Sequence, residues 1–374
     1  MKEGWEYKKL GDLCRIRTGK LDANAANDNG LYPFFTCSVT PLKINNYAYD
    51  CECVLVAGNG DLNVKYYSGK FNAYQRTYII ESNDNNVLDV RYLYMFLSEY
   101  VTILRKKSIG AIIKYIKLGY LTEAKIPFLS LSEQQSIVDY LDSSFAKIDA
   151  MKANAEKALN EAKALFQASL KEMLEPKEGW EEKKLGDIGE LKNGMNFNKN
   201  ESGYNVHILG VGDFGNLFQI NDTDHLQTIS LNSNPSAEYI LKNEDIVFVR
   251  SNGNKNLVGR CVLIHVGDEP CSFSGFCIRF RKSTNEVDAC YLTHFLKTED
   301  ARKRLVGNGA NISNLNQKVL SEFIVSYPSL QEQQSIVATL DSLKSKVDRL
   351  QENYNKISQE CDALKQAILR QVFE

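Results

Sequence analysis

The most regular hydrophobic pattern lies in the last part of the chain. Apolar side chains recur there at alternating steps of four and three residues, at Ile336, Leu340, Leu343, Val347, Leu350, Tyr354, Ile357, Cys361, Leu364 and Ile368. This spacing places one apolar stripe along an α-helix and is typical of a coiled coil. No proline or glycine interrupts residues 331–374, so the pattern predicts one long helix.

A second stripe of the same kind runs through the middle of the chain. Its members are Ile137, Leu141, Ser144, Ile148, Met151, Ala155, Ala158, Ala162 and Leu165. The alanines at its centre would let a neighbouring helix approach closely. Residues 132–174 also lack proline and glycine, which predicts a second long helix.

Both helices have a recognisable start. Ser132 with Gln135, and Ser329 with Glu332, have the spacing of a capping box. Glu133 and Glu332 also place negative charge near the first turn, where the helix dipole favours it.

The other parts of the chain consist of short apolar runs between turn residues. Residues 51–58, 76–80, 245–251 and 261–266 are rich in β-branched side chains, which predicts strands. Residues 91–100 and 290–296 each predict a short helix. We therefore expect the α+β class, with two globular domains.

An internal repeat organises these elements. Residues 2–12 read KEGWEYKKLGD and residues 177–187 read KEGWEEKKLGD, while LSEQQSIVDYLDS at 131–143 recurs as LQEQQSIVATLDS at 330–342. The offset grows from 175 to 199 residues, so the second copy holds about 24 more. The chain is a tandem duplication, alike at the borders of each copy and divergent between them.

The repeat divides the chain into four parts. Residues 1–131 and 176–330 are predicted to be the globular domains, and residues 132–175 and 331–374 the long helices.

A globular domain that opens with GWxxxxLGD and leads through EQQSIV into a long helix, twice in succession, resembles the specificity subunit of type I restriction–modification systems. The resemblance covers essentially the whole chain. It implies two target recognition domains on an antiparallel coiled coil with pseudo-two-fold symmetry, reading a bipartite target on double-stranded DNA. It also implies assembly with two methyltransferase subunits and two restriction (motor-nuclease) subunits in the cytoplasm.

No motif in the chain indicates catalysis of its own. The Asn-Pro-Pro-aromatic loop of amino-methyltransferases and the nucleotide-binding P-loop are both missing. The four histidines lack the i, i+4 spacing of metal ligands, and the nine cysteines form no CxxC pair. We therefore expect no enzyme activity and no cofactor, with S-adenosylmethionine, ATP and Mg²⁺ bound only by partner subunits. The sequence contains no run of 18 or more apolar residues, so it predicts no membrane span.

The net charge of −2 does not by itself indicate nucleic-acid binding, so DNA contacts must come from local clusters. Arginine, lysine and asparagine in predicted turns are the candidates, because these side chains read base edges and bind phosphates. In the first domain they are Lys20, Asn59, Arg76, Lys106, Lys107 and Lys114. In the second domain they are Asn193, Arg250, Asn252, Asn254 and Lys255.

The twin EQQ sequences admit two interpretations. Starting the helices explains them structurally, and binding a partner subunit is a possible additional role for Glu133, Gln134, Gln135, Glu332, Gln333 and Gln334.

Two alternatives to the main hypothesis stay open. One is the specificity subunit of a related system whose methyltransferase and nuclease activities share one partner chain. The other is a coiled-coil interaction scaffold with no role on DNA. Binding to DNA in the presence of methyltransferase subunits separates the scaffold from the other two.

Overall fold

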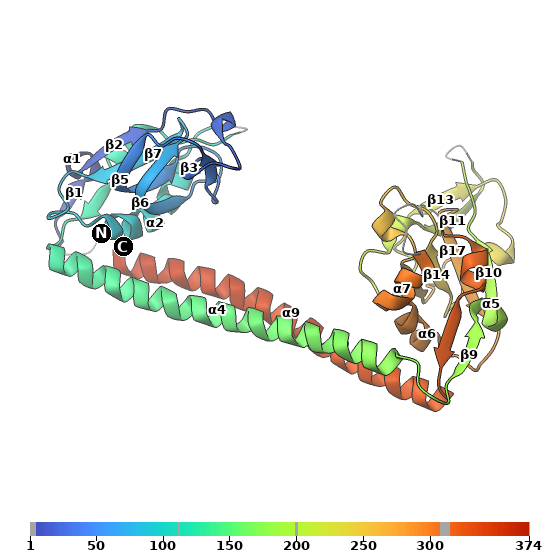
Figure 1. Cartoon of the computed structure of the whole chain (residues 1–374). Helices are drawn as coiled ribbons and strands as arrows, with labels where there is room; N and C mark the ends of the chain where they lie inside the picture. The colour runs from blue at the N-terminus through green and yellow to red at the C-terminus, as the bar shows by residue number, and fades with distance from the viewer. Residues whose placement is uncertain (1–4, 111–112, 199–200, 307–314, 374) are drawn as a thin grey trace. The chain divides into compact units, whose positions relative to one another are not determined.

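The computed structural model describes residues 5–110, 113–198, 201–306 and 315–373. The chain forms two compact units: unit 1 comprises Met1–Lys157 with Glu352–Glu374, and unit 2 comprises Ala158–Gln351. Helices α4 (Leu131–Leu174) and α9 (Leu330–Phe373) are each divided between the two units (Figure 1). These bounds lie within one residue of the predicted helices.

The globular part of unit 1 is α+β, as expected. Its elements in chain order are β1 (Tyr7–Lys9), α1 (Leu10–Leu13), β2 (Cys14–Thr18), η1 (Ala23–Ala25), β3 (Tyr32–Phe35), β4 (Leu42–Ile44), β5 (Tyr49–Ala57), β6 (Val64–Ala73), β7 (Thr77–Ser82), α2 (Val90–Lys107), α3 (Leu118–Thr122) and β8 (Lys125–Pro127). The order in the larger sheet is β2-β7-β5-β6-β3-β4, and β1 pairs with β8.

The globular part of unit 2 is also α+β. Its elements are β9 (Glu181–Lys184), α5 (Leu185–Ile188), β10 (Gly189–Asn193), β11 (Tyr204–Leu209), η2 (Val211–Asp213), β12 (Gln219–Ile220), β13 (Thr228–Leu231), η3 (Ala237–Tyr239), β14 (Ile246–Val249), η4 (Lys255–Leu257), β15 (Cys261–Ile264), β16 (Cys271–Phe273), β17 (Cys277–Lys282), α6 (Ala289–Leu296), α7 (Glu299–Val306), α8 (Gln317–Ser321) and β18 (Ile324–Tyr327). Its sheets have the orders β10-β17-β14-β15-β12, β13-β11-β16 and β18-β9.

The duplicated sequence produces a duplicated sheet. The order β2-β7-β5-β6 in unit 1 corresponds to β10-β17-β14-β15 in unit 2, and the β1–β8 pair corresponds to β9–β18. The strands predicted at 51–58, 76–80, 245–251 and 261–266 are β5, β7, β14 and β15. The predicted helix at 91–100 is longer than expected, because α2 continues to Lys107.

Within each unit, α4 and α9 run antiparallel. In unit 1 an ion pair joins Lys365 to Asp149 at 2.6 Å, and another joins Lys152 to Asp362 at 3.5 Å. In unit 2 Lys163 donates to the side-chain oxygen of Gln351 at 2.7 Å. The antiparallel pairing implied by the resemblance is confirmed.

The buried stripe of α4, its seam, differs from the predicted stripe at every second position in the later part of the helix. Ile148 is buried as expected, but Met151 and Leu165 are 60% and 61% exposed. Leu159 is instead buried, and Phe166 packs against the core of unit 2. The alanine-rich stretch contains two apolar stripes one residue apart, and the stripe with the larger side chains forms the seam.

The seam of α9 also changes near its end. Leu364 is 47% exposed, whereas Leu369 and Phe373 are buried in the core of unit 1. The Phe373 ring lies 5.5 Å from the ring of Tyr92 on α2. The last turns therefore pack against the globular domain and leave the predicted heptad register.

The helix starts partly confirm the predicted capping boxes. At α4 the box is formed by Ser130 and Glu133: the Ser130 amide donates to the Glu133 carboxylate at 2.9 Å, and the Glu133 amide donates back to Ser130 Oγ at 3.4 Å. The prediction that used Ser132 with Gln135 was wrong, because Ser132 lies inside the helix. At α9 the Glu332 amide donates to Ser329 Oγ at 3.4 Å, as predicted.

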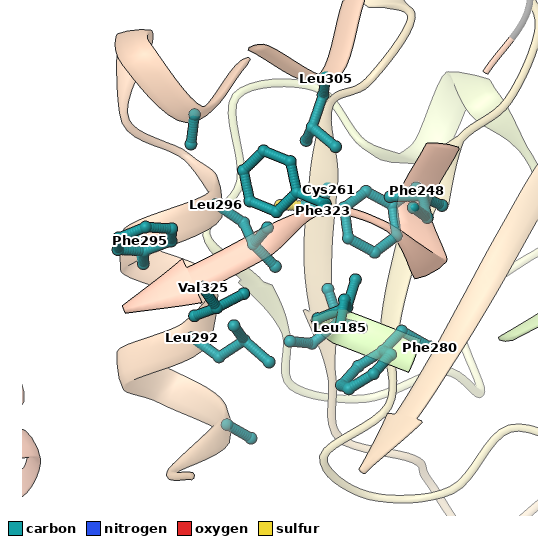
Figure 2. Packing of buried hydrophobic residues seen from close by; sticks show 14 of the residues in the cluster. Leu185, Phe248, Cys261, Phe280, Leu292, Phe295, Leu296, Leu305, Phe323 and Val325 are labelled. Carbon is teal, nitrogen blue, oxygen red and sulfur yellow. The ribbon is translucent and has the colours of Figure 1, made fainter. Parts of the chain in front are cut away.

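Each unit has its own hydrophobic core between its helices and sheet. In unit 2, Leu292, Phe295 and Leu296 of α6 pack among side chains of β14, β15 and β17 (Figure 2). Burial of these large apolar side chains stabilises the domain that carries the turns.

Candidate nucleic-acid interface

Backbone hydrogen bonds bring four segments of the first domain together. The amide of Gly19 donates to Thr77 O at 3.1 Å, that of Gly58 to Arg76 O at 2.8 Å, and that of Gly60 to Lys114 O at 2.9 Å. The predicted residues Lys20, Asn59, Arg76 and Lys114 therefore lie in adjacent turns. We call residues 19–21, 58–60, 74–76 and 113–115 the first turn surface.

Glycine is required where these turns meet. A Cβ added to Gly19 would lie 2.1 Å from Ala73 O, and one added to Gly58 would lie 2.3 Å from Arg76 O. Since such contacts are far inside van der Waals distance, only glycine allows the two backbones to approach this closely.

The end of α2 adjoins the first turn surface. Ile109 and Tyr115 exchange backbone hydrogen bonds of 2.8 and 3.0 Å, and Arg105 donates to Leu62 O at 2.6 Å. Lys106 and Lys107 occupy the last turn of α2 and are exposed. All six residues predicted in the first domain thus belong to neighbouring segments.

The cations of this surface have no acidic partner in the described part of the chain. Lys20, Arg76, Lys106, Lys107 and Lys114 are exposed, and none of them forms an ion pair there. Elsewhere on the first domain the exposed Lys9 is paired with Glu123 at 2.7 Å. Cations without local partners are free to bind phosphates.

The second domain builds an equivalent surface from equivalent backbone contacts. The amide of Gly194 donates to Cys277 O at 3.0 Å, and that of Arg250 donates to Phe276 O at 2.8 Å. A Cβ on Gly194 would lie 2.0 Å from Ser274 O. The backbones of these two segments therefore approach each other as closely as those at Gly19 and Ala73 in the first domain. We call residues 193–195, 250–254 and 274–276 the second turn surface.

The predicted residues of the second domain differ in their exposure and in the hydrogen bonds that their side chains already form. Arg250 is half-buried, and its guanidinium donates to Gly275 O at 3.3 Å. The side-chain oxygens of Asn252 and Asn254 accept from backbone amides two residues later, at 2.8 and 3.1 Å, which leaves their amino groups to donate. Asn193 ends β10 and is half-buried. The side chain of Lys255 lies outside the described residues.

The two turn surfaces carry different side chains at equivalent places. Arg250 is equivalent to Gly58 of the first domain. The Arg250 amide donates to the backbone oxygen of the residue before β17, and the Gly58 amide donates to that of the residue before β7. At that residue the first domain has Arg76 and the second has Phe276, which is 60% exposed. The sequence analysis did not include Phe276, although aligning the segments that lead into β7 and β17 would have indicated it.

The central glutamines of the EQQ sequences lie inside the protein. Gln134 is fully buried: its oxygen accepts from the Asp89 amide at 2.9 Å, and its amino group donates to Val87 O at 2.9 Å and Leu129 O at 3.0 Å. These bonds join α4 to the segment before α2 and to the segment before α4 itself. Asp89 in turn caps α2 by accepting from the Tyr92 amide at 2.8 Å.

Gln333 repeats this arrangement in unit 2. Its oxygen accepts from the Asp288 amide at 2.8 Å, and its amino group donates to Glu286 O at 2.8 Å and Pro328 O at 2.9 Å. Gln333 is also fully buried. The expectation of direct partner contact therefore needs correction for Gln134 and Gln333, because neither exposes any surface in the free chain.

The other residues of the EQQ sequences are exposed, and partner contact stays a prediction for them. Glu133 caps α4, and its hydrogen bond to the Ser130 hydroxyl lowers the pKa of its carboxyl. Gln135 donates to Asp139 at 2.9 Å, one turn further along α4. Glu332 and Gln334 are exposed at the start of α9.

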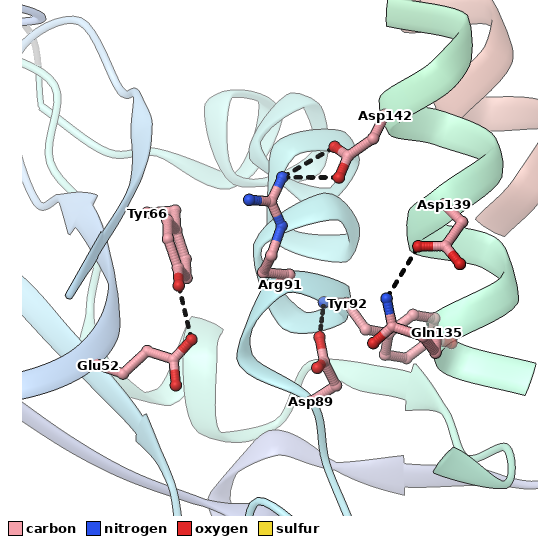
Figure 3. Close-up of polar contacts among 8 residues, drawn as sticks. All are labelled: Glu52, Tyr66, Asp89, Arg91, Tyr92, Gln135, Asp139 and Asp142. Atoms are coloured by element: carbon pink, nitrogen blue, oxygen red, sulfur yellow. Dashed lines mark hydrogen bonds and ion pairs between the residues drawn. The ribbon is translucent and has the colours of Figure 1, made fainter. Parts of the chain in front are cut away.

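A polar network joins the first domain to α4 (Figure 3). Arg91 donates to both carboxylate oxygens of Asp142, at 2.8 and 2.9 Å, and its guanidinium lies 5.3 Å from the ring of Tyr66. Tyr66 in turn donates to Glu52 at 2.6 Å. The network therefore runs from β5 and β6 through α2 to α4.

In unit 2 the repeat-equivalent aspartate has a different partner. Asp341 lies 3.3 Å from Nε2 of His294, whose ring centroid is 4.3 Å from that of Phe218. Burial lowers the pKa of His294 below its ordinary value, and the nearby Asp341 opposes that shift only in part.

The fold and its duplicated surfaces define a protein with two like domains carried on a shared pair of helices. The family model described as "Type I restriction modification DNA specificity domain" matches residues 2–161 and again residues 177–359. The chain belongs to this family, that of the specificity subunits of type I restriction–modification systems.

Individual relatives agree with this assignment along nearly the whole chain. The type I restriction enzyme EcoDI specificity subunit of Escherichia coli is 29% identical, over 99% of this chain and 88% of the relative. The MjaVIII specificity subunit of Methanocaldococcus jannaschii is 24% identical, over 98% of this chain and 91% of the relative.

Solved structures share the fold. One, from a study of complex assembly and conformational transition of the type I R-M system, matches with a TM-score of 0.73 at 17% identity, covering 100% of this chain and 98% of the other. The HsdS subunit from Thermoanaerobacter tengcongensis matches with a TM-score of 0.61 at 18% identity, covering 100% and 97%. Within the described residues, no helix has the length and apolar character needed to cross a membrane.

Proposed function

We propose that the chain is the non-catalytic subunit that reads DNA sequence for a type I restriction–modification complex. Each domain recognises one half of a bipartite target, the first through the first turn surface and the second through the second turn surface. The subunit also acts as the scaffold on which two methyltransferase and two restriction subunits assemble in the cytoplasm. S-adenosylmethionine, ATP and Mg²⁺ belong to those partners.

One observation supports this function most strongly. Key contacts that build the two domains match, while the side chains that the domains present are different. Gln134 and Gln333 make matching sets of three hydrogen bonds, and Gly19 and Gly194 make matching close turns. A recognition protein for two unrelated half-sites needs this combination, because the scaffold must be kept while the reading residues vary.

The side chains that differ between the two turn surfaces have the chemistry needed to recognise bases. Arg250, by pairing with O6 and N7, would favour guanine in the second half-site, and the exposed Phe276 would favour the methyl group of thymine. In the first domain Lys20, Arg76 and Lys114, which form no ion pair with the described residues, offer phosphate contacts and one arginine for base recognition.

The function is tested by reconstitution. The full chain, purified methyltransferase subunits of its own system, and their mixture are each incubated with host DNA and S-adenosylmethionine, and methylated adenines are then mapped by sequencing. We expect methylation only in the mixture, at one bipartite motif. Methyl transfer by the chain alone would contradict the non-catalytic role. A mixture that assembles but binds no DNA would favour the scaffold alternative.

A further inference from the structure

One arginine of the second domain is buried, and no partner for it is found among the described residues. Arg279 on β17 exposes only 3% of its surface. Within the described part of the chain its Nε has no hydrogen-bond partner, and the residue forms no ion pair there. Buried guanidinium groups are normally paired, because an isolated buried charge is costly.

Neighbouring cations on the same face are paired, so the isolation of Arg279 is specific. Arg281 binds Asp245 through two hydrogen bonds of 2.7 and 2.6 Å. Lys192, directly across from Arg279 on β10, is paired with Glu238 at 2.7 Å. Two of the carboxylates that act on Arg279, Asp245 and Glu238, thus already pair with other cations.

Arg279 lines a cavity of about 590 Å³ in unit 2. Lys192 and Lys318 line the same cavity, and so do Glu238, bound to Lys192, and the exposed Glu190. Burial and then the nearby Arg281 lower the pKa of Arg279 below its ordinary value, and the carboxylates of Asp245, Glu190 and Glu238 oppose this shift only in part.

The first domain shows that the fold does not need this arginine. Ile79 on β7 occupies the equivalent place. In the strand register Ile79 lies opposite Arg17 and Leu55, and Arg279 lies opposite Lys192 and Val247 in the same way. Ile79 is fully buried. An apolar side chain therefore satisfies the scaffold at this position, and the arginine in the second domain calls for another explanation.

We propose that the cavity around Arg279 is an oxyanion site that takes a phosphate group. The planar guanidinium fork matches two phosphate oxygens, and Lys192 and Lys318 supply further positive charge at the same cavity. Two sources offer this chemistry: a phosphate of the DNA backbone beside the second half-site, and free phosphate. The site itself does not depend on the proposed function, whereas the first of these two sources does.

Binding is tested first without DNA. Thermal unfolding of the full chain is followed while inorganic phosphate replaces chloride at constant ionic strength. The melting temperature of the wild type should rise with the logarithm of phosphate concentration once that concentration exceeds the dissociation constant, as expected for binding at one site of the folded chain. In Arg279→Ile, which installs the residue of the first domain, the apparent affinity for phosphate should fall by about tenfold or more.

Further variants keep this test decisive. Arg279→Lys retains the charge without the fork and should bind with intermediate affinity. Glu190→Gln removes a competing carboxylate and should bind phosphate more tightly than the wild type. Arg349→Met, which removes a charge from the exposed face of α9, should respond as the wild type does. Equal phosphate responses in the wild type and both Arg279 variants would overturn the proposal.

A second measurement separates the two sources. In the complex with methyltransferase subunits, the logarithm of the DNA association constant is followed against the logarithm of salt concentration. If Arg279 binds a backbone phosphate, the slope for Arg279→Ile should be smaller in magnitude by about 0.9. An unchanged slope together with loss of the phosphate response assigns the site to free phosphate. A failure of the proposed function would appear differently, as absence of DNA binding by the wild-type complex.

Discussion

Replacing the buried glutamine of each EQQ sequence tests whether these residues hold the recognition domains in place. In Gln134→Ala, three backbone groups lose their partner: the Asp89 amide, Val87 O and Leu129 O. A buried polar group left without a partner costs about 1–3 kcal/mol, and some of these groups will find water in the space that the side chain leaves. We therefore expect unit 1 to lose roughly 3–5 kcal/mol of unfolding free energy.

The chain contains a convenient reporter for each unit. Its two tryptophans are Trp5 in unit 1 and Trp180 in unit 2, so replacing either one by phenylalanine leaves fluorescence from the other. Urea unfolding followed through Trp5 should show the loss in Gln134→Ala, and unfolding followed through Trp180 should show the same loss in Gln333→Ala. The exposed neighbours provide matched controls, because Gln135→Ala and Gln334→Ala should change stability by no more than about 0.5 kcal/mol.

The opposite pattern would refute this reasoning. If Gln134→Ala unfolds at the same urea concentration as Gln135→Ala but no longer assembles with methyltransferase subunits, the glutamine is a partner contact and its burial in the free chain is incidental.

Three further predictions follow from the surfaces, the seam and the buried histidine. Arg250→Gly, which installs the residue of the first domain, should weaken DNA binding by the reconstituted complex by about 1–3 kcal/mol, measured by fluorescence anisotropy. A loss that is equal for all sequences at the second half-site would instead identify a phosphate contact. Leu159→Ala should lower the unfolding free energy by about 2–5 kcal/mol, whereas Met151→Ala should have little effect; equal effects would show that the seam is misassigned. His294 has a lowered pKa in the folded chain, so the unfolded chain takes up the proton first, and stability should decline as the pH falls below about 6.5. This decline should be smaller in His294→Gln, and identical pH profiles would exclude His294 as its cause.

The sequence predicted the large features of the fold because they depend on local patterns. Long runs without proline or glycine defined α4 and α9 to within one residue, and the short apolar runs defined β5, β7, β14 and β15. The seam of α4 was harder, since Met151 and Leu165 belong to one apolar stripe and Leu159 and Phe166 to another. Both stripes have helical spacing and lie one residue apart, so spacing alone does not decide between them.

The candidate site was predictable in part. The sequence singled out turn residues with cationic or amide side chains as candidate DNA contacts, and their role on DNA stays a prediction. It could not show that those of the first domain are neighbours, because their proximity depends on hydrogen bonds such as Gly58 to Arg76, which link distant segments. Arg279 was missed for a similar reason. The alternation along β17 places Arg279 and Arg281 on one face, yet it does not reveal that Asp245 pairs with only one of them.

The central claim is that each domain reads its own half of the target, and one measurement tests it most directly. Residues 13–109 are exchanged for the equivalent region of another specificity subunit with a known target, the complex is reconstituted with its methyltransferase subunits, and methylated adenines are mapped by sequencing. The account predicts that one half of the bipartite motif changes to that of the donor while the other half stays the same. A change in both halves, or in neither while the chimera remains active, would contradict it.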